Sequence, residues 1–349
     1  MPAVHRPTMA DVAELAGVSK ATVSLVISGR AACSPIRISQ ETQARVLAAA
    51  QKLGYSVNVI ARNMSAERTH TLGLVTHEFV EYGPATILAS AQAAARAHDH
   101  FLMVAGTEPD VDAIYEQIMR LDSWRVDGIF VAVPMIGDWH QALFRRLQLH
   151  IPVVWLEGAA LSPTIHSVGV DNIRGGELAV EHLVALGHRH IGLISGPHHW
   201  LAAQHRLLGW QRAMAAAGLD PADGAMAEGD WTTPGGYHAA RSLLDRCPGL
   251  TAIVAHNDNM ALGAMRALHE RGLRVPADVS IVGYDDIPSA PYVDPPLTTV
   301  RQNLARVGQV AVDLLIEAGR DPALVRQEAV TPELIVRESS APPAGAARA

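Results

Sequence analysis

Apolar positions within the first 54 residues recur with the spacing of short amphipathic helices. The pattern predicts a first helix between a capping Thr8 and a terminating Gly17. A second helix follows, capped by Ser19, and a third runs from Ser39 to Gly54. The expected inward faces are Val12, Leu15 and Ala16, then Val23, Val26 and Ile27, then Val46, Leu47, Ala50 and Leu53. Two short helices joined by a tight turn match the helix-turn-helix pattern, although a generic three-helix bundle has the same spacing.

From residue 72 onward the pattern changes to short apolar runs that alternate with helical periodicity. The runs TLGLVTH, FLMVAG, GIFVAVP and PVVWLEG are typical of buried strands, and HIGLIS, AIVAHND and VSIVGYDD continue the series. This alternation predicts an α/β fold with parallel sheets, and the number of strands suits two Rossmann-like lobes. Ligands of such sheets bind beyond the carboxyl ends of the strands.

Charge divides the chain in the same place as the hydrophobic pattern. Residues 1–70 carry eight lysine and arginine residues against four acidic ones, a net charge of +4, and the rest of the chain carries −11. The chain has two lysines, Lys20 and Lys52, and Lys20 lies on the outward face of the second predicted helix. A small basic head on a large acidic body indicates that the head binds a polyanion and the body does not.

Other features of the sequence bear on compartment. Cys33 and Cys247 lie far apart and form no CxxC motif, which suits a reducing environment. The first residues contain no apolar core of signal-peptide length, and no run of eighteen apolar residues occurs. We therefore expect a cytoplasmic protein with no membrane partner, and a disordered tail over residues 339–349.

Motifs of catalysis do not match the sequence. GLISG lacks the GxSxG spacing, HEFVE is not HExxH, and no GxGxxG opens a helix after a strand. The paired histidines have spacings that suit no helical metal site. We therefore expect no enzyme, no cofactor and no metal, although a nucleophile and a base on separate loops remain an open alternative. A solute-binding protein of transport is a second alternative, which the basic head and the missing signal peptide disfavour.

Several long segments, in order, carry a resemblance to a known family. MADVAELAGVSKATVS, followed by GY and VIARNMS, and later VEHLVALGH, NMALGAMRAL and GLRVPADVSIVGYDD resemble the LacI/GalR family of bacterial transcription regulators over nearly the whole chain. The resemblance implies a helix-turn-helix DNA-binding domain over 1–56, a hinge helix and linker over 57–70, and a two-lobed, periplasmic-binding-protein-like effector domain over 71–338. Its N-lobe would comprise about 71–168 and 302–328, and its C-lobe about 169–301 and 329–338.

The resemblance also implies which residues contact DNA. They are Thr8, Ser19, Lys20, Ala21, Thr22, Ser24, Leu25, Ser28, Tyr55, Asn58, Ala61 and Met64. Lys20 would reach a guanine edge or a phosphate, and Met64 would wedge into the minor groove from the hinge helix. A plain linker helix is the alternative for the hinge.

Three departures from the family pattern put the operator sequence in doubt. Leu25 stands where many members carry an arginine or histidine that reads a base. Val57 replaces the proline of the family's Tyr-X-Pro entry to the hinge, and RAACSPIR lengthens the loop before the third helix.

For the effector, the resemblance matches Arg206, Asn257, Asp285 and Gln302 to residues that hold sugar hydroxyls, and Trp231 to an aromatic that packs on a sugar face. His77, Trp155 and Glu157 stand at strand ends of the other lobe but differ in type from the family pattern. This set of donors, acceptors and an indole suits a polyol. The alternatives are a core position for Trp231, an Arg206–Asp285 bridge, and a capping or bridging role for Asp286.

The expected function is that of a homodimeric repressor that binds double-stranded operator DNA and is released by a small sugar. A nucleobase or a sugar phosphate acting as corepressor is the alternative, and Trp200 argues against a purine because purine-binding members place an arginine there. The leucine-heptad tail of tetrameric members is missing after residue 338, so we expect a dimer.

Overall fold

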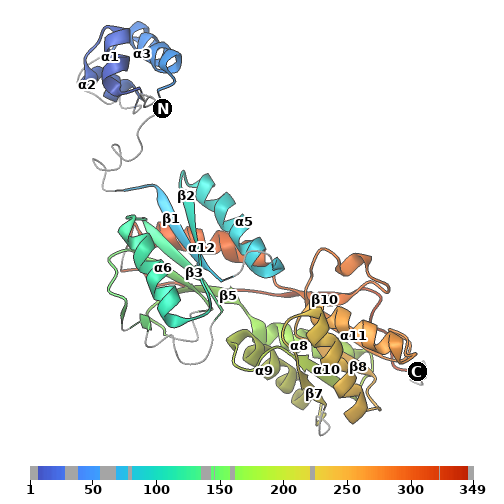
Figure 1. The fold of residues 1–349 in the computed structure, drawn as a ribbon. Helices are drawn as coiled ribbons and strands as arrows, with labels where there is room; N and C mark the ends of the chain where they lie inside the picture. The colour runs from blue at the N-terminus through green and yellow to red at the C-terminus, as the bar shows by residue number, and fades with distance from the viewer. Residues whose placement is uncertain are drawn as a thin grey trace, which may run out of the picture. The chain divides into compact units, whose positions relative to one another are not determined.

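The chain folds into two compact units, Met1–Thr69 and His70–Ala349, which are described separately below. The computed structural model (Figure 1) describes residues 7–27, 38–55, 68–77, 81–134, 143–144, 146–157, 162–220, 225–321 and 323–344. None of the helices in these ranges combines the length and the hydropathy needed to span a bilayer.

The first unit contains the three predicted helices, α1 (Met9–Ala16), α2 (Lys20–Ile27) and α3 (Gln40–Leu53). Thr8 donates its backbone N–H and its hydroxyl to the Asp11 carboxylate at 2.7 and 2.9 Å, and Gly17 ends the helix in the left-handed conformation. Ser19 caps α2 by accepting the Thr22 N–H at 3.1 Å. The local signals thus set these boundaries as the sequence predicts.

The core of this unit differs from the predicted one at two positions. Its buried residues are Val12, Ala13, Ala16, Val23, Val26, Val46 and Ala49. Leu15 is 45% exposed and Leu47 is 55% exposed, so their predicted inward positions are wrong. Ala13 is buried in place of Leu15, and Ala49 in place of Leu47, so in each helix the buried stripe is turned to one side of the predicted one.

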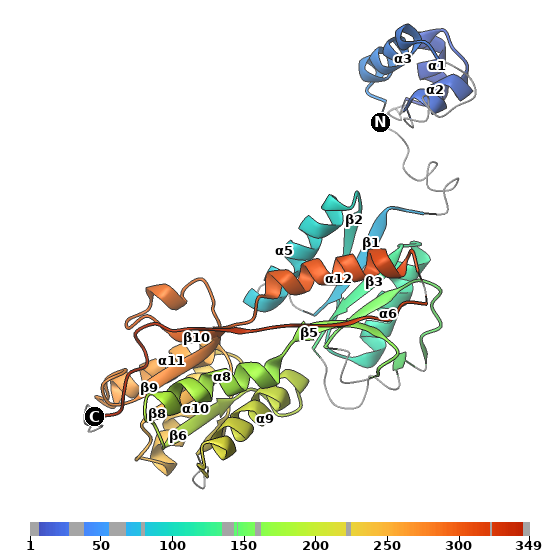
Figure 2. The same ribbon diagram turned by 180° about the vertical axis from the view of Figure 1, so that it is seen from behind.

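The second unit consists of two lobes, each built on a six-stranded sheet. The N-lobe sheet has the order β11-β5-β4-β3-β1-β2, and all of its strands are parallel. Its elements are β1 (Thr71–Thr76), α5 (Tyr82–Ala97), β2 (Phe101–Gly106), α6 (Val111–Ser123), β3 (Gly128–Ala132), β4 (Val153–Leu156), β5 (His166–Val170), α12 (Leu304–Ala318) and β11 (Gln327–Val330). The helices α5 and α12 pack side by side (Figure 2).

The C-lobe sheet has the order β12-β10-β9-β8-β6-β7, with β12 antiparallel to β10 and the other pairs parallel. Its elements are α8 (Asn172–Ala185), β6 (Ile191–Ser195), α9 (Leu201–Ala216), β7 (Met226–Glu228), α10 (Thr233–Arg246), β8 (Ala252–Ala255), α11 (Asp258–Glu270), β9 (Ser280–Asp285), the 3-10 turn Ala290–Tyr292, β10 (Thr298–Arg301) and β12 (Glu333–Ile335). Apolar clusters lie on both faces of each sheet, as expected of parallel sheets covered by helices.

Three crossings of the chain connect the lobes. They lie between β5 and α8, between β10 and α12, and between β11 and β12. The lobe boundaries expected near residues 168, 301 and 328 fall within three residues of these crossings. All three crossings run beside one another, so a change of angle between the lobes requires only local changes at these segments.

The tail boundary predicted at residue 339 is wrong, because Ser339–Ala341 are held against the C-lobe. The Ser339 hydroxyl donates to the Ile281 carbonyl at 2.6 Å and accepts the Thr298 N–H at 2.8 Å. The buried ring of His188 lies 2.8 Å from the Ala341 carbonyl oxygen. A composition rich in small residues does not predict these hydrogen bonds, which depend on partners far away in the sequence.

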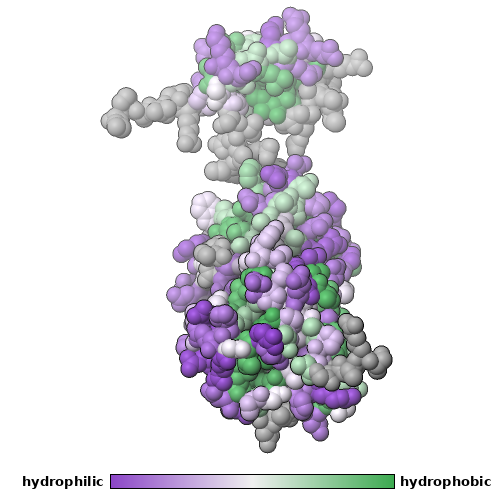
Figure 3. Space-filling view, turned by 90° about the vertical axis from the view of Figure 1, so that its right-hand side faces the viewer, coloured by the Kyte–Doolittle hydropathy of each residue, from purple (hydrophilic) through white to green (hydrophobic). Residues whose placement is uncertain are grey.

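The surface of the body mixes hydrophilic side chains with apolar patches on the face drawn in Figure 3. Among the described residues, large exposed apolar side chains include Phe101 at the start of the edge strand β2, Trp124 after α6, and Tyr292 in the C-lobe. Exposed aromatic side chains of this size are typical of protein interfaces.

Candidate functional site

A cleft lies between the two lobes at the carboxyl ends of their strands. It holds about 910 Å³ of empty space, including its open mouth. Its lining includes five of the predicted effector residues from the sugar-like set, Arg206, Trp231, Asn257, Asp285 and Gln302, together with His77 and Glu157. The structure therefore brings seven of the eight predicted effector residues to one cavity.

Arg206, on α9, is the buried cation of the cleft. Its Nε donates to Asn172 Oδ1 at 2.8 Å, and its Nη1 donates to the His256 carbonyl oxygen. The guanidinium carbon lies 3.8 Å from the centre of the Tyr284 ring and 5.5 Å from that of Trp231. These contacts replace the alternative of a direct Arg206–Asp285 bridge and fix the orientation of the guanidinium.

Asn172 is a functional residue that the sequence reasoning missed. Its Nδ2 donates to Glu157 Oε1 at 2.7 Å, and its Oδ1 also accepts from the Tyr284 hydroxyl at 3.1 Å. Asn172 therefore joins Glu157 of the N-lobe to Arg206 of the C-lobe. Asn172 comes two residues after strand β5, in the run SVGVDN. A polar residue just beyond a strand is the sequence signal that would have identified it.

Two carboxylates in the cleft are held away from water. Burial raises the pKa of Glu157, with the Arg206 charge and the Asn172 amide opposing this effect. Burial also raises the pKa of Asp285 to about 6, while Arg206 and Gln302 act to lower it. Gln302 donates its side-chain amide to Asp285, so a residue at the crossing after β10 is tied to the end of β9.

Asn257 has a structural role as well as a place in the cleft. Its Oδ1 caps α11 by accepting the Met260 N–H at 2.9 Å, and its Nδ2 donates to the Trp231 carbonyl at 2.8 Å. Trp231 adopts a positive φ of 71° and is half-buried against the C-lobe core while its ring also lines the cleft. Trp231 thus packs on the core, as one sequence alternative held, and also lines the cleft, where its contact with a sugar stays a prediction.

Aromatic rings from both lobes meet in the cleft. The ring centres of Trp200 and Trp231 are 5.7 Å apart, and those of His77 and Trp200 are 6.0 Å apart. Trp200 precedes α9, and His77 follows β1.

Trp155 is the predicted effector residue that the structure places elsewhere. Its side chain is 3% exposed, and its ring meets Phe144 edge-on at 4.6 Å within the N-lobe core. Side chains along a strand alternate between the two faces of the sheet, and Trp155 packs on the face covered by α6. The prediction for Trp155 is wrong, whereas its neighbours Leu156 and Glu157 line the cleft.

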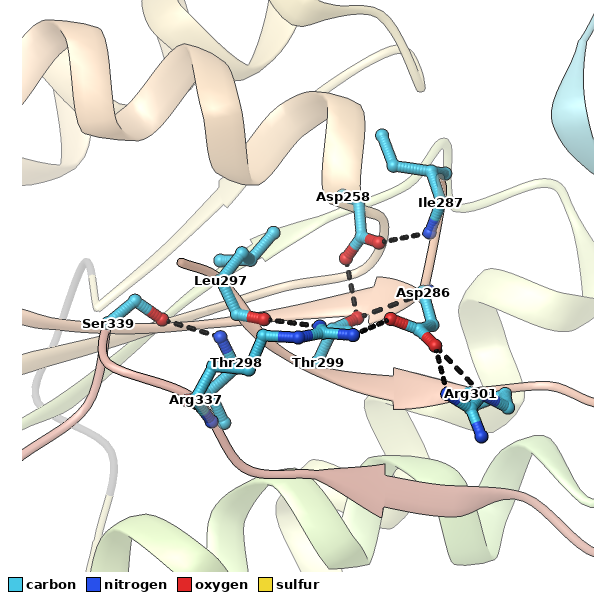
Figure 4. A network of polar contacts seen from close by, with 9 residues as sticks. All are labelled: Asp258, Asp286, Ile287, Leu297, Thr298, Thr299, Arg301, Arg337 and Ser339. Carbon is cyan, nitrogen blue, oxygen red and sulfur yellow. Dashed lines mark hydrogen bonds and ion pairs between the residues drawn. The ribbon is translucent and has the colours of Figure 1, made fainter. Parts of the chain in front are cut away.

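A network of hydrogen bonds and ion pairs surrounds Asp286, the residue after Asp285 (Figure 4). Asp286 receives hydrogen bonds from Arg301 at 2.8 Å and from Arg337 at 2.5 Å, which makes it a bridge, as one of the sequence alternatives held. Asp258 accepts from the Thr299 hydroxyl at 2.5 Å and from the Ile287 N–H at 2.9 Å. The network holds the turn that follows β9 and thereby helps to position Asp285, the last residue of that strand.

On the first unit, α2 presents the predicted DNA-contacting face. Lys20, Ala21 and Ser24 are exposed, as are Thr8 and Ser19, and Thr22 and Leu25 are half-buried. Tyr55 packs partly against the core of this unit. Ser28, Asn58, Ala61 and Met64 lie outside the described residues. Over the described ranges, no three His, Cys, Asp or Glu side chains are grouped to hold a metal ion.

Comparisons with known proteins extend this picture. Residues 8–58 match the model for "Bacterial regulatory proteins, lacI family", and residues 180–340 match that for "Periplasmic binding protein-like domain". The chain is 33% identical to the lactose operon repressor of Escherichia coli (strain K12) over 337 residues, 96% of this chain and 91% of the relative. It is also 33% identical to the ribose operon repressor of the same strain over 336 residues, 95% of this chain and 99% of the relative.

The fold shows the same relationship. A crystal structure of the lac repressor dimer bound to operator and the anti-inducer ONPF superimposes with a TM-score of 0.88 at 32% sequence identity. The match covers 97% of this chain and all of that chain. Identity above 30% over nearly the full length of both chains, with matching domains in the same order, shows common descent. The chain belongs to the lacI family of bacterial regulatory proteins.

Proposed function

We propose that this chain is a repressor that binds operator DNA through α2 and leaves it when a small sugar enters the cleft. One observation carries the proposal: Arg206, Asn257, Asp285, Gln302 and Trp231 line a single cavity in a chain that also bears the helix-turn-helix unit. These side chains supply donors, acceptors and an apolar ring face, which is the set that a pyranose requires.

The cleft connects ligand binding to the angle between the lobes. Glu157 and His77 reach it from the N-lobe, whereas Arg206 and Asp285 reach it from the C-lobe. A ligand that bridges the two sets stabilises one lobe angle over another, and only this difference in affinity changes the affinity for DNA. Gln302 lies on a crossing segment and contacts Asp285, so it joins the ligand to the hinge between the lobes.

On the DNA side, Lys20 and the small exposed side chains Ala21 and Ser24 allow α2 to approach the major groove. Met64 remains the proposed minor-groove wedge. We propose a homodimer on a palindromic operator, supported by the exposed Phe101 and Tyr292 side chains and by the dimeric lac repressor structure. Because the target is chromosomal DNA, the proposed place of action is the cytoplasm.

Ser195, His198 and Glu228 lie near the cleft in the order of a nucleophile, a base and an acid, but their geometry does not support a hydrolase. Ser195 Oγ lies 2.9 Å from His198 Nε2, and His198 Nδ1 lies 3.7 Å from Glu228 Oε2. Ser195 has no exposed surface, so no substrate reaches its hydroxyl. These three residues instead hold the turn that precedes α9, and the proposed function is binding without catalysis.

The test is release of operator DNA from the full chain by a panel of sugars, nucleobases and sugar phosphates. We expect one sugar to release the wild-type protein and to leave Asp285→Asn bound, with unchanged DNA affinity in the absence of ligand. Asp278→Asn, on the exposed C-lobe surface, is the matched control and should respond like the wild type. Release by a nucleobase or sugar phosphate alone would overturn the sugar assignment, and an Asp285→Asn protein that responds would overturn the site.

A further inference from the structure

The cleft offers two separate aromatic platforms instead of one slot. The Trp200 and Trp231 rings are 5.7 Å apart and tilted by 59°. A sugar held between two parallel rings needs a separation of roughly 7–8 Å, twice the carbon–carbon contact distance. The two indoles are therefore too close together and too strongly tilted to hold a sugar between them, and both line the cavity.

The two indoles have different polar neighbours. Trp231 lies beside Arg206 and under Gly196, where an added Cβ would come within 2.2 Å of the indole. Its Nε1 is buried without a hydrogen-bond partner among the described residues. Trp200 has its Nε1–H donated to His199 Nε2 at 3.0 Å, which leaves its ring face as the group it offers.

Hydrogen bonds hold the Trp200 ring in place, and the ring contacts a side chain of the other lobe. The turn before Trp200 is fixed by the His198 N–H bond to Glu228 at 3.0 Å and by the Gly196 N–H bond to His256 Nδ1 at 3.1 Å. His77 of the N-lobe meets the Trp200 ring at 73° and 6.0 Å. A sugar ring that packs on Trp200 therefore lies between the two lobes. It lies beside the polar side chains around Arg206 and not among them.

Charge limits what the ligand can carry. The described lining contains three acidic side chains, Glu81, Glu157 and Asp285, against one arginine, Arg206. That arginine already donates to Asn172 and to the His256 carbonyl. A phosphate or carboxylate on the ligand would face three acidic side chains against one guanidinium, at a cost that burial increases.

We infer that the effector is an uncharged glycoside of two ring units, with one ring among Arg206, Asp285 and Trp231 and the second on Trp200 and His77. This inference rests on the proposed function, because it assigns the ligand of the same cleft. Trp200 and Trp231 both line this cleft, together with His77 of the N-lobe, so each of the two rings has an aromatic partner.

The test is calorimetric titration of the full chain with matched sugars. The panel comprises lactose, cellobiose, maltose, sucrose and trehalose, their constituents glucose, galactose and fructose, and glucose 6-phosphate. We expect at least one disaccharide to bind at least tenfold tighter than either constituent, and glucose 6-phosphate to bind more weakly than glucose. Equal or tighter binding of a monosaccharide or of glucose 6-phosphate would overturn the inference.

Variants separate stacking from folding. Trp200→Leu should remove the disaccharide's advantage and leave monosaccharide affinity within twofold of the wild type, and Trp200→Phe should keep part of the advantage. Trp124→Leu, which alters an indole 65% exposed after α6, is the matched control and should change neither affinity. Equal weakening of disaccharide and monosaccharide in both Trp200 variants would contradict a second ring subsite.

Failure of the inference and failure of the proposed function give different results. A disaccharide that binds tightly and depends on Trp200 but does not release operator DNA would leave the ligand class standing and overturn the repressor mechanism. A monosaccharide that releases operator DNA as efficiently as any disaccharide would do the reverse. A chain that binds none of the sugars would overturn both the sugar assignment and the two-ring inference.

Discussion

Asn172 and Arg206 form a buried pair within the C-lobe, with Arg206 Nε donating to Asn172 Oδ1 at 2.8 Å, and the Asn172 amide links this pair to Glu157 of the N-lobe. The same amide donates to Glu157, so one side chain orients both a cation and an anion of the cleft. A neutral amide can do this because it carries both a donor and an acceptor.

Replacing this amide should therefore affect stability and ligand response together. Asn172→Leu leaves the Arg206 Nε and the Glu157 carboxylate without their buried partner, and we expect a loss of about 3 kcal/mol in unfolding free energy. Urea unfolding measures this loss, and operator release measures the response, which should disappear. Gln309→Leu, which changes an exposed amide on α12, is the control; equal stability of the two variants would refute the role of Asn172.

The position of the Trp231 ring should depend on the absence of a side chain at Gly196. A Cβ there would lie 2.2 Å from two carbons of the indole, so Gly196→Ala must displace the ring. We expect sugar affinity to fall at least tenfold, measured by calorimetry. Gly249→Ala, which adds a Cβ with nothing within 4 Å, should leave the affinity unchanged. Unaltered binding in Gly196→Ala would remove Trp231 from the ligand site.

Above about pH 6.5 stability should fall as pH rises, because two carboxyls favour the protonated form; below that pH, buried histidines with lowered pKa values act in the opposite direction. Burial raises the pKa of Asp285 to about 6 and that of Asp258 to about 8. Above about pH 4 an unfolded aspartate releases its proton while these folded ones retain theirs, so the folded state binds more protons. The stabilisation is complete below pH 4 and is lost as pH rises through 6 and then 8.

Each carboxyl contributes at most about 1.4 kcal/mol per pH unit to this slope. Asp258→Asn should reduce the slope between pH 6 and 8, measured by urea unfolding at several pH values. Asp278→Asn is the comparison, because Arg274 holds the pKa of Asp278 at about 2, below this window. A slope that Asp258→Asn leaves unchanged would show that Asp258 is ionised in the folded protein.

The two lysines allow a test of the DNA-binding face. Lys20 is exposed at the start of α2, whereas Lys52 is exposed on the last turn of α3. Lys20→Met should weaken operator binding about tenfold and, if it contacts phosphate, reduce the salt dependence by about one unit of slope. Lys52→Met should have a smaller effect on both. The reverse order of effects, measured by DNA titration at several salt concentrations, would place the DNA on another face.

The end of the chain should contribute to the stability of the C-lobe. Deletion from Ser339 removes its hydrogen bonds to Ile281 and Thr298 and uncovers His188. We expect a loss of about 2–4 kcal/mol in unfolding free energy, from several buried bonds of about 1 kcal/mol each. A chain that ends at Ala344 keeps these bonds and should be as stable as the full chain. Equal stability of both truncations would show that the segment is dispensable.

Local patterns in the sequence determined much of this protein. Thr8, Asp11 and Gly17 set the bounds of α1 through hydrogen bonds that span three or four residues, and the apolar runs set the strands. Because parallel strands end at one edge of a sheet, residues just beyond them were expected to meet, and Arg206, Asn257 and Asp285 do line one cleft.

Other features were decided only by the tertiary structure. They depend on contacts between residues distant in the chain, or on the face of the sheet to which a side chain points. Trp155 and Leu156 are neighbours on β4, yet they pack on opposite faces of the sheet, and only Leu156 also lines the cleft, because strand side chains alternate. Asn172 became visible as a link only when Glu157, Arg206 and Tyr284 were brought around it. Ser339 is ordered for the same reason, since its partners lie about 40 and 60 residues away. Hydrogen bonds and packing across such separations have no periodic signature, so the fold itself must supply them.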